Sequence, residues 1–444
     1  MQSPNLAPRT RRIIGGVTVL GVAGSLALAG CSQDQAAEGG DKLVIQVQSV
    51  QQPAFEFAAE ILKETHPDVE VEFQIVTEEQ KVTTNSQIMA SSSAPDIGLV
   101  PANSQPYFDL VKADKLVAVD DVWENADLEA RYGEDVANAL KWDGTPYLTL
   151  FDSVIYNVVY YNEAAFEAAG ITAPENHQIT SDEELYSIVD KLNDAGYDGL
   201  AAGGGSAFQL GWLMDAQLQA NASESGFQDF LTSWRTGEID STPYTSPEFV
   251  DSVAHIQEWS ENGVFPTGFI AQQLDQAQAM FTAGEAGMFL GGSWMPSILE
   301  VDFDFDWLLL PGIEEGSSTL PTLFTGDTLA IPTSSKNIDL AKEFLEIYSS
   351  DEVQTFAAAN VGSLPAVNTV DAASIPELGE VVQSIVEFGA ADGTGIGWTA
   401  TLPSSIGETF IVQQLQQLIS GQLTPDQVGE GEQQRVEDYV AQNG

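Results

Sequence analysis

The side chains that usually carry covalent or metal chemistry are scarce in this chain. It has one cysteine, Cys31, and three histidines, His66, His177 and His255, which lie far apart in the sequence. One cysteine cannot form an internal disulfide, and separated histidines offer little for a zinc site. No Gly-x-Ser-x-Gly turn and no His-Glu-x-x-His motif occurs. We therefore expect no catalytic residues, no bound metal and no cofactor.

Aromatic rings and polar groups are better placed to bind a ligand, because several of them follow predicted strands or glycine-rich turns. Trp294 follows a Gly-Gly-Ser turn, Trp212 follows three glycines at residues 203–205, and Trp398 follows the glycine-rich residues 393–397. Aromatic faces pack against apolar surface, and polar side chains replace the hydrogen bonds that a ligand loses with water. The polar candidates at predicted strand ends are Gln48, Gln51, Thr84, Asn103, Ser104, Asp152, Gln209 and Asp327.

Each of these candidates also has a structural alternative. The turn before Trp294 favours a binding position over a core position, whereas Trp398 could take either. Trp212 lies at helical spacing from Phe208 and Asp215, so a core position is about equally compatible. Asp327 could cap a turn instead of binding a ligand. We expect the other tryptophans to pack in cores, namely Trp123, Trp142, Trp234, Trp259 and Trp307.

The first 30 residues have the pattern of an export signal. Three arginines within residues 9–12 precede an apolar run at residues 13–29, which is short for a membrane span. Leu28-Ala29-Gly30-Cys31 resembles a bacterial lipobox, which implies cleavage before Cys31 and acylation of that residue. The alternative is an ordinary signal peptide that happens to contain a cysteine. Residues 31–41 then form the lipidated cysteine and a flexible polar tether.

Charge limits the partners of the chain. Asp and Glu total 66 and Lys and Arg only 15, for a formal net charge of −51 over 444 residues. Nucleic-acid affinity depends on Lys and Arg that neutralise phosphates, so we expect no nucleic-acid partner. A general attraction to anionic lipid is excluded for the same reason, so contact with the membrane is expected through the lipid anchor alone.

Hydrophobic periodicity predicts an α/β protein. Residues 43–47 and 96–100 are apolar strands, residues 69–75 alternate strictly, and helices are predicted between them. This βαβαβ order favours a parallel sheet. The middle of the chain is richer in helix, with a capping box at Ser181 and an N-cap followed by proline at Ser246.

Several segments, in order along the chain, resemble the carbohydrate-type family of extracellular solute-binding proteins of ABC importers, which includes maltose-binding protein. The matching segments are residues 94–97 (APDI), 160–170 (YYNEAAFEAAG), 280–294 (MFTAGEAGMFLGGSW), 311–312 (PG), 329–332 (LAIP) and 421–425 (GQLTP). Each match is weak alone, but the ordered set behind a lipobox is specific. Between residues 146 and 161 the chain runs longer than the family usually does.

The resemblance implies a two-lobe periplasmic-binding-protein-like fold of type II, with a hinge between the lobes and the ligand in the interlobe cleft. By analogy, residues 41–150 and 325–362 form the N-terminal lobe, and residues 151–324 and 363–440 form the C-terminal lobe. It further implies a monomer at the outer face of a bacterial cell membrane that passes a carbohydrate to the membrane subunits of an ABC importer. The stacking role of Trp294 also rests on the resemblance.

Two other functions are compatible with the sequence. A surface glycoside hydrolase would need a pair of carboxylates, and 66 acidic residues leave many possible pairs. The same fold could instead bind a peptide, a polyamine or another solute. The scarcity of Lys and Arg disfavours anionic cargo.

Overall fold

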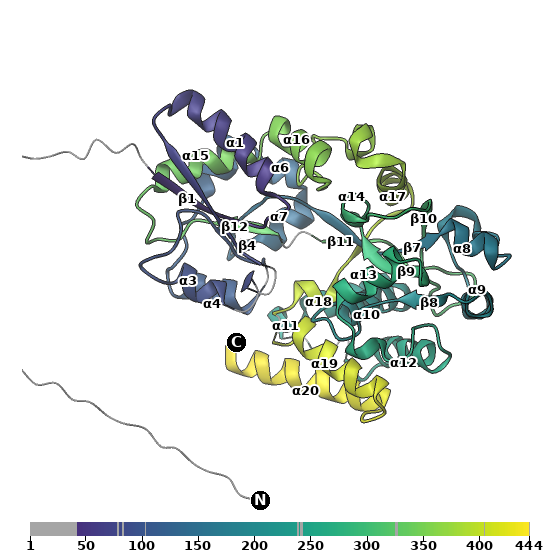
Figure 1. Ribbon diagram of the computed structural model, residues 1–444. Helices are drawn as coiled ribbons and strands as arrows, with labels where there is room; N and C mark the ends of the chain where they lie inside the picture. The colour runs from purple at the N-terminus through teal and green to yellow at the C-terminus, as the bar shows by residue number, and fades with distance from the viewer. Residues whose placement is uncertain are drawn as a thin grey trace, which may run out of the picture. The chain divides into compact units, whose positions relative to one another are not determined.

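The computed structural model describes residues 42–443, apart from residues 78–79, 82–83, 103, 238, 240–242, 325–326 and 404 (Figure 1). The elements before the first long strand are β1 (Lys42–Val47), α1 (Gln52–Thr65), β2 (Glu70–Ile75), α3 (Asn85–Met89), β3 (Gly98–Leu99), α4 (Gln105–Lys112), α5 (Asp120–Asn125), α6 (Leu128–Tyr132), α7 (Glu134–Leu140), β4 (Lys141–Trp142), β5 (Thr145–Pro146) and β6 (Thr149–Leu150). The parallel pairing of β1 with β2, and a parallel bridge from Ile45 to Ile97, confirm the predicted opening.

The middle of the chain builds a larger sheet. Its elements are β7 (Val154–Asn162), α8 (Glu163–Ala168), α9 (Asp182–Ala195), β8 (Asp198–Ala201), α10 (Gln209–Asn221), α11 (Glu224–Thr236), α12 (Pro247–Glu261), α13 (Leu274–Thr282), β9 (Ala286–Gly292), α14 (Met295–Ile298), β10 (Phe305–Leu308) and β11 (Thr322–Phe324). With β13 (Gly395–Ile396) from later in the chain, the strand order is β13-β11-β7-β9-β8, and β10 also pairs with β7. We call these six strands the large sheet.

The last part of the chain contributes to both regions. Its elements are β12 (Thr328–Ala330), α15 (Ile338–Tyr348), α16 (Asp351–Val361), α17 (Gly379–Asp392), β13 (Gly395–Ile396), α18 (Trp398–Thr401), α19 (Glu408–Ile419) and α20 (Pro425–Asn443). Strand β12 pairs with β3 and β6, whereas β13 pairs with β11 of the large sheet.

The chain therefore passes three times between the N-terminal strands and the large sheet. It does so between β6 and β7, between β11 and β12, and after α16, which packs on α1. The passages touch one another, because Ser153 donates its backbone N–H to Leu364 O at 3.0 Å and Phe151 donates to Asp327 O at 3.2 Å. The lobe boundaries given above stay predictions.

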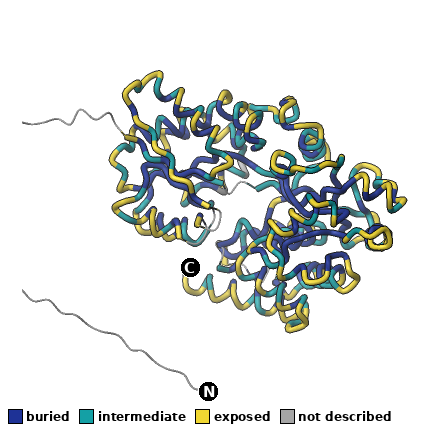
Figure 2. The backbone as a smooth tube through the Cα atoms, in the orientation of Figure 1, coloured by how far each residue is buried: buried dark blue, intermediate teal, exposed yellow. Residues whose placement is uncertain are grey.

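Local sequence explains the helices that cover the sheets. Helix α1 has proline in its first turn, and Phe55, Ala59 and Leu62 repeat at helical spacing on its buried face. The predicted capping box is present at α9, where Ser181 Oγ accepts from Glu184 N at 3.2 Å. Figure 2 shows the result, with buried strands inside and exposed residues along the outer helices.

Helix α10 is different, because it is buried almost all round. Its buried residues include Leu210, Leu213, Met214 and Leu218, together with the polar side chains of Asp215 and Gln217. It contacts α12, α18 and α19 as well as β7 and β13. A helix with this environment is a core element, and its buried polar residues, which also include Gln209, need hydrogen-bond partners.

Candidate functional site

Aromatic side chains from four segments meet beside the large sheet. We call Tyr156, Phe208, Trp212, Trp294 and Phe324 the aromatic cluster. The Trp212 ring lies 5.0 Å from Phe208 in a stacked arrangement, 5.2 Å from Tyr156 and 5.7 Å from Trp294 at 78°. Phe324 meets Tyr156 edge-on at 6.4 Å. All but Tyr156 are half-buried, so parts of four ring surfaces remain accessible.

The end of β9 fixes the position of Trp294. Ser293 donates its backbone N–H to Ile155 O at 2.7 Å, and its hydroxyl accepts from Ile155 N at 3.1 Å. The indole of Trp294 lies over Gly292, where a Cβ atom would come within 2.1 Å of the ring. Only glycine leaves room for this arrangement, which explains the Gly-Gly-Ser-Trp sequence.

Polar side chains gather where the three passages meet. We call Gln51, Lys81, Asp152, Asp327 and Ser363 the polar cluster. Asp152 Oδ2 accepts from Ser363 Oγ at 3.1 Å and from Gln51 Nε2 at 3.3 Å. Lys81 Nζ lies 2.6 Å from Asp327 Oδ1, and both side chains are largely buried, at 7% and 15% exposure.

Burial controls the charge of this cluster. Burial, and then the nearby charge of Asp327, raise the pKa of Asp152 well above its usual value, although Ser363, Lys81 and Gln51 oppose the shift. The neutral form of Asp152 is the one that this environment favours. Asp152 Oδ1 and Gln51 Oε1 are buried and have no hydrogen-bond partner in the described part of the chain. Buried polar atoms without a partner can pair with the hydroxyl groups of a ligand, the protonated Asp152 as donor and Gln51 Oε1 as acceptor.

The two clusters are neighbours. Asp152 of the polar cluster and Tyr156 of the aromatic cluster are four positions apart in extended chain, which spans about 13 Å. A groove of about 510 Å³ lies between α14 and the ends of α16 and α17, and no residue of either cluster lines it. Its lining includes Val50, Ser293 and Gly362, and each of these directly precedes a residue of one of the clusters. This volume is in the range of small-molecule sites.

Several predicted site residues belong to these clusters. Trp212 and Trp294 lie together in the aromatic cluster, and Gln51, Asp152 and Asp327 lie together in the polar cluster. Gln48 is close to the second group, because its carbonyl accepts from Gln51 N at 3.1 Å. Whether any of them binds a ligand stays a prediction.

Other predicted residues have local structural contacts. Ser104 caps α4, where its hydroxyl accepts from Tyr107 N at 3.2 Å, and Thr84 directly precedes α3. Gln209 is buried and donates to Leu290 O at 2.9 Å, so it ties the glycine-rich loop to β9. Asn103 and Cys31 lie outside the described residues.

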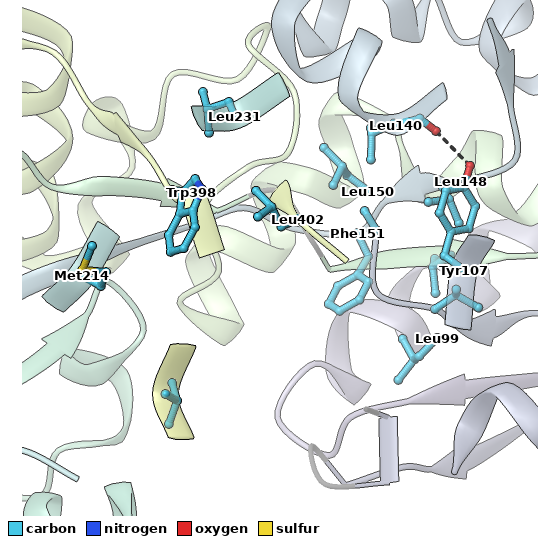
Figure 3. Packing of buried hydrophobic residues seen from close by; sticks show 14 of the residues in the cluster. Leu99, Tyr107, Leu140, Leu148, Leu150, Phe151, Met214, Leu231, Trp398 and Leu402 are labelled. Atoms are coloured by element: carbon cyan, nitrogen blue, oxygen red, sulfur yellow. Dashed lines mark hydrogen bonds between the residues drawn. The ribbon is translucent and has the colours of Figure 1, made fainter. Parts of the chain in front are cut away.

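Trp398 is fully buried at 0% exposure. Its ring packs against Phe249 at 5.4 Å and Tyr244 at 5.8 Å, and Figure 3 shows it among buried side chains that include Met214 and Leu402. A ring enclosed in this way offers no face to a ligand. We therefore leave Trp398 out of the binding surface discussed below.

Some cluster members were not among the predicted site residues. Tyr156 and Phe324 lie within strands, where an aromatic residue usually indicates packing. Lys81 could have been noticed as one of only 15 basic residues that follows an acidic pair at residues 78–79. Ser363 follows a glycine after a helix and carries no pattern that distinguishes it from a turn residue.

The described residues contain no helix with both the length and the apolarity needed to span a bilayer. A family model described as "Bacterial extracellular solute-binding protein" matches residues 46–355. No curated protein matches the chain in sequence.

Solved structures of known binding proteins are similar in fold. A chitin oligosaccharide binding protein has a TM-score of 0.76 at 20% identity, covering 90% of this chain and 99% of its own. An ABC substrate-binding protein from Listeria monocytogenes in complex with cycloalternan has a TM-score of 0.70 at 15% identity, with 90% and 99% coverage. Maltose-bound MalE3 of T. maritima has a TM-score of 0.66 at 18% identity, also with 90% and 99% coverage. The predicted two-lobe α/β fold is confirmed.

Proposed function

Because the chain belongs to the bacterial extracellular solute-binding protein family, we propose that it captures a sugar or oligosaccharide and delivers it to an ABC importer. The aromatic cluster is the single observation that carries the choice of ligand class. Half-buried rings at different angles, such as Trp212 and Trp294 at 78°, can stack on the C–H faces of successive pyranose rings. Chitin oligosaccharide, cycloalternan and maltose, which appear in the names of structural neighbours, are carbohydrates.

The polar cluster supplies the complementary chemistry. Asp152 Oδ1 and Gln51 Oε1 are buried without a partner in the described residues, so a movement that exposes them lets sugar hydroxyls pair with them, with the protonated Asp152 as donor and Gln51 Oε1 as acceptor. A protonated Asp152 and the ion pair between Lys81 and Asp327 leave no strong net charge among these groups. With 66 acidic and 15 basic residues in the whole chain, this favours uncharged over anionic cargo.

Capture follows from the position of the polar cluster on the three passages. A ligand that touches both clusters binds more tightly when the lobes approach, so it shifts the equilibrium between open and closed forms towards the closed one. The closed form then docks on the membrane subunits of the importer.

The polar cluster also has a feature of glycoside hydrolases. A neutral and an ionised carboxylate side by side are what a glycosidase uses. However, Asp152 is only 2% exposed, and Asp327 is held by Lys81. A binding protein without catalytic activity is the function that this geometry favours.

Calorimetric titration with neutral chito-, malto- and galacto-oligosaccharides, with a glucuronide as the anionic control, tests the proposal. We expect one neutral series to bind and to be recovered intact. Trp294→Ala should weaken that binding by about 1–3 kcal/mol if its ring stacks on the sugar. Trp142→Ala is the matched control, because Trp142 is also half-buried but lies outside the aromatic cluster. Release of new reducing ends would favour the hydrolase, and an unchanged Kd in Trp294→Ala would remove that ring from the site.

We also propose that a lipid on Cys31 anchors the protein at the outer face of the cell membrane. Two or three acyl chains give stable anchoring, whereas a single chain does not. Cys31→Ser should release the protein into the medium and abolish incorporation of a labelled fatty acid. Incorporation that persists in Cys31→Ser would contradict this assignment.

A further inference from the structure

A buried carboxylate stands directly behind the aromatic cluster. Asp215 lies three residues after Trp212 in α10 and is 0% exposed. Its Oδ2 accepts from the hydroxyl of Tyr156 at 2.8 Å and from Thr399 Oγ1 at 2.8 Å, and its Oδ1 accepts from Thr399 N at 2.7 Å. The carboxylate therefore joins β7, α10 and α18 at one point.

These contacts lead outward to the accessible rings. Tyr156, which donates to Asp215, places its ring 5.2 Å from Trp212, and Trp212 lies 5.7 Å from Trp294. Asp215 and Trp212 share one turn of the same buried helix, so the phenol is held at both its hydroxyl and its ring. A change in the tilt of Tyr156 would shift the packing surface beneath Trp212.

The backbone of the glycine-rich segment packs directly against the hydroxyl of Tyr156. At Gly397, a Cβ atom would lie 2.1 Å from the hydroxyl of Tyr156 and 3.1 Å from Asp215 Oδ2. The neighbouring Gly395 approaches Gln219 as closely, with a Cβ atom at 2.0 Å from its Oε1. The glycine-rich segment thus packs tightly over the pair and excludes water from it.

Such a site is costly to build, because an enclosed carboxylate loses its hydration. Burial raises the pKa of Asp215 to about 7, although the hydrogen bonds from Thr399 and Tyr156 oppose the shift. A hydrophobic residue would fill the same space without this cost. The directional hydrogen bond to Tyr156 is what a hydrophobic residue could not provide.

We infer that Asp215 is a positioning residue for ligand recognition, which holds Tyr156 so that its ring fixes the orientation of Trp212 towards Trp294. The inference rests on the proposed function, because it assigns Asp215 a role behind the same sugar-binding surface. Asp215 is fully buried behind the rings, so its effect on the ligand passes through Tyr156, while its bonds to Thr399 hold α18 in place.

A double-mutant cycle tests the inference. In Asp215→Asn the amide NH₂ replaces one acceptor oxygen, and in Tyr156→Phe only the hydroxyl is lost. We expect each variant to bind the sugar about tenfold more weakly than the wild type, and the double variant to bind no more weakly than Asp215→Asn alone, because the contact between Tyr156 and Asp215 is already lost in that variant. Losses that multiply in the double variant, or unchanged affinity in both single variants, would overturn the inference.

Asp182→Asn is the matched control. Asp182 likewise accepts from an aromatic side chain, the indole of Trp259 at 2.7 Å, and from His255 at 2.9 Å, but among the described residues it has no hydrogen bond to the aromatic cluster. We expect this variant to be less stable than the wild type and to bind the sugar with unchanged affinity. A loss of affinity as large as that of Asp215→Asn would mean that destabilisation alone explains the effect.

Near-ultraviolet circular dichroism gives a readout that needs no sugar. Asp215→Asn should change the tryptophan bands, and the change should disappear in a Trp212→Phe background. If no sugar binds the wild type, the proposed function fails while this spectroscopic test of the positioning role still stands. If Asp215→Asn does not fold, Tyr156→Phe provides the same comparison. Identical spectra in the folded variant and the wild type would refute the positioning role.

Discussion

Raising the pH from 4 to 8 should destabilise the folded protein. The pKa of Asp215 rises from 3.8 in the unfolded chain to about 7 in the fold, because burial disfavours the charged form. The protonated carboxyl is favoured in the fold, so its stabilisation is complete below pH 4 and is lost as the pH rises to about 7. A pKa shift of about three units, at about 1.4 kcal/mol per unit, lowers the free energy of unfolding by at most about 4 kcal/mol.

Two further buried carboxyls act in the same direction. Burial raises the pKa of Asp152 and of Glu432 well above their usual values. Asp182 acts in the opposite direction: although burial opposes it, hydrogen bonds from His255 and Trp259 lower its pKa, so its contribution is lost below about pH 4. We therefore expect maximal stability in mildly acidic solution.

Urea denaturation at pH 5 and pH 8 measures the effect, with Asp215→Asn as the variant. Repulsion within a chain of formal net charge −51 also destabilises the fold as acidic groups ionise. Salt screens this repulsion between exposed charges, whereas the contribution of the buried carboxyls remains. In 1 M NaCl, the wild type should still lose free energy of unfolding between the two pH values, and Asp215→Asn should lose less. Equal losses in the two proteins would refute the assignment of this pH dependence to Asp215.

Two further substitutions probe the clusters separately. Gly292→Ala should weaken sugar binding, because the new Cβ would lie 2.1 Å from the Trp294 ring. Gly211→Ala is the control and should bind normally, because its Cβ would have no neighbour nearer than 3.4 Å. Equal affinities of the two variants in calorimetry would contradict the packing argument. Lys81→Met should lower the free energy of unfolding by about 3–5 kcal/mol, since it removes the cation from a buried ion pair with Asp327. Lys63→Met, which breaks an exposed pair with Glu60, should cost less than about 1 kcal/mol in the same urea titration.

The order of elements was predictable because periodicity is a local property. The alternation of residues 69–75, the proline in the first turn of α1 and the capping box at Ser181 each specify their structure within a few residues. Trp294 was predictable as a turn residue, since a Gly-Gly-Ser sequence at the end of a strand leaves an aromatic ring little to pack against except the glycine backbone.

Tyr156 could not be assigned in this way. Strand β7 has a register shift between Tyr156 and Val158, where Asn157 adopts a positive φ of 62°. A bulge of this kind changes which face the following residues present, so alternation along the strand does not tell Tyr156 from Tyr160. The tyrosines differ only through their partners: Tyr156 donates to Asp215, and Tyr160 donates to Gly292 O.

Trp398 illustrates the opposite problem. Its glycine-rich neighbours suggested an open loop, but Gly395 and Gly397 lack side chains because their backbone lies directly against Gln219 and Tyr156. Glycine is compatible both with an exposed turn and with close packing, and only the tertiary structure separates the two. The sequence therefore left a core position and a binding position equally open for a residue that is fully buried.

The enclosure of α10 has a consequence for dynamics. Amides in a helix that is surrounded by α12, α18, α19 and β7 exchange with solvent only through large openings, so α10 should be among the last segments to take up deuterium. Trp212 is mounted on this slow-exchanging helix. A ligand that binds against Trp212 therefore meets a side chain whose rotamer is already fixed, and little conformational entropy is lost on binding. The selectivity of the site then depends on the shape of the ligand.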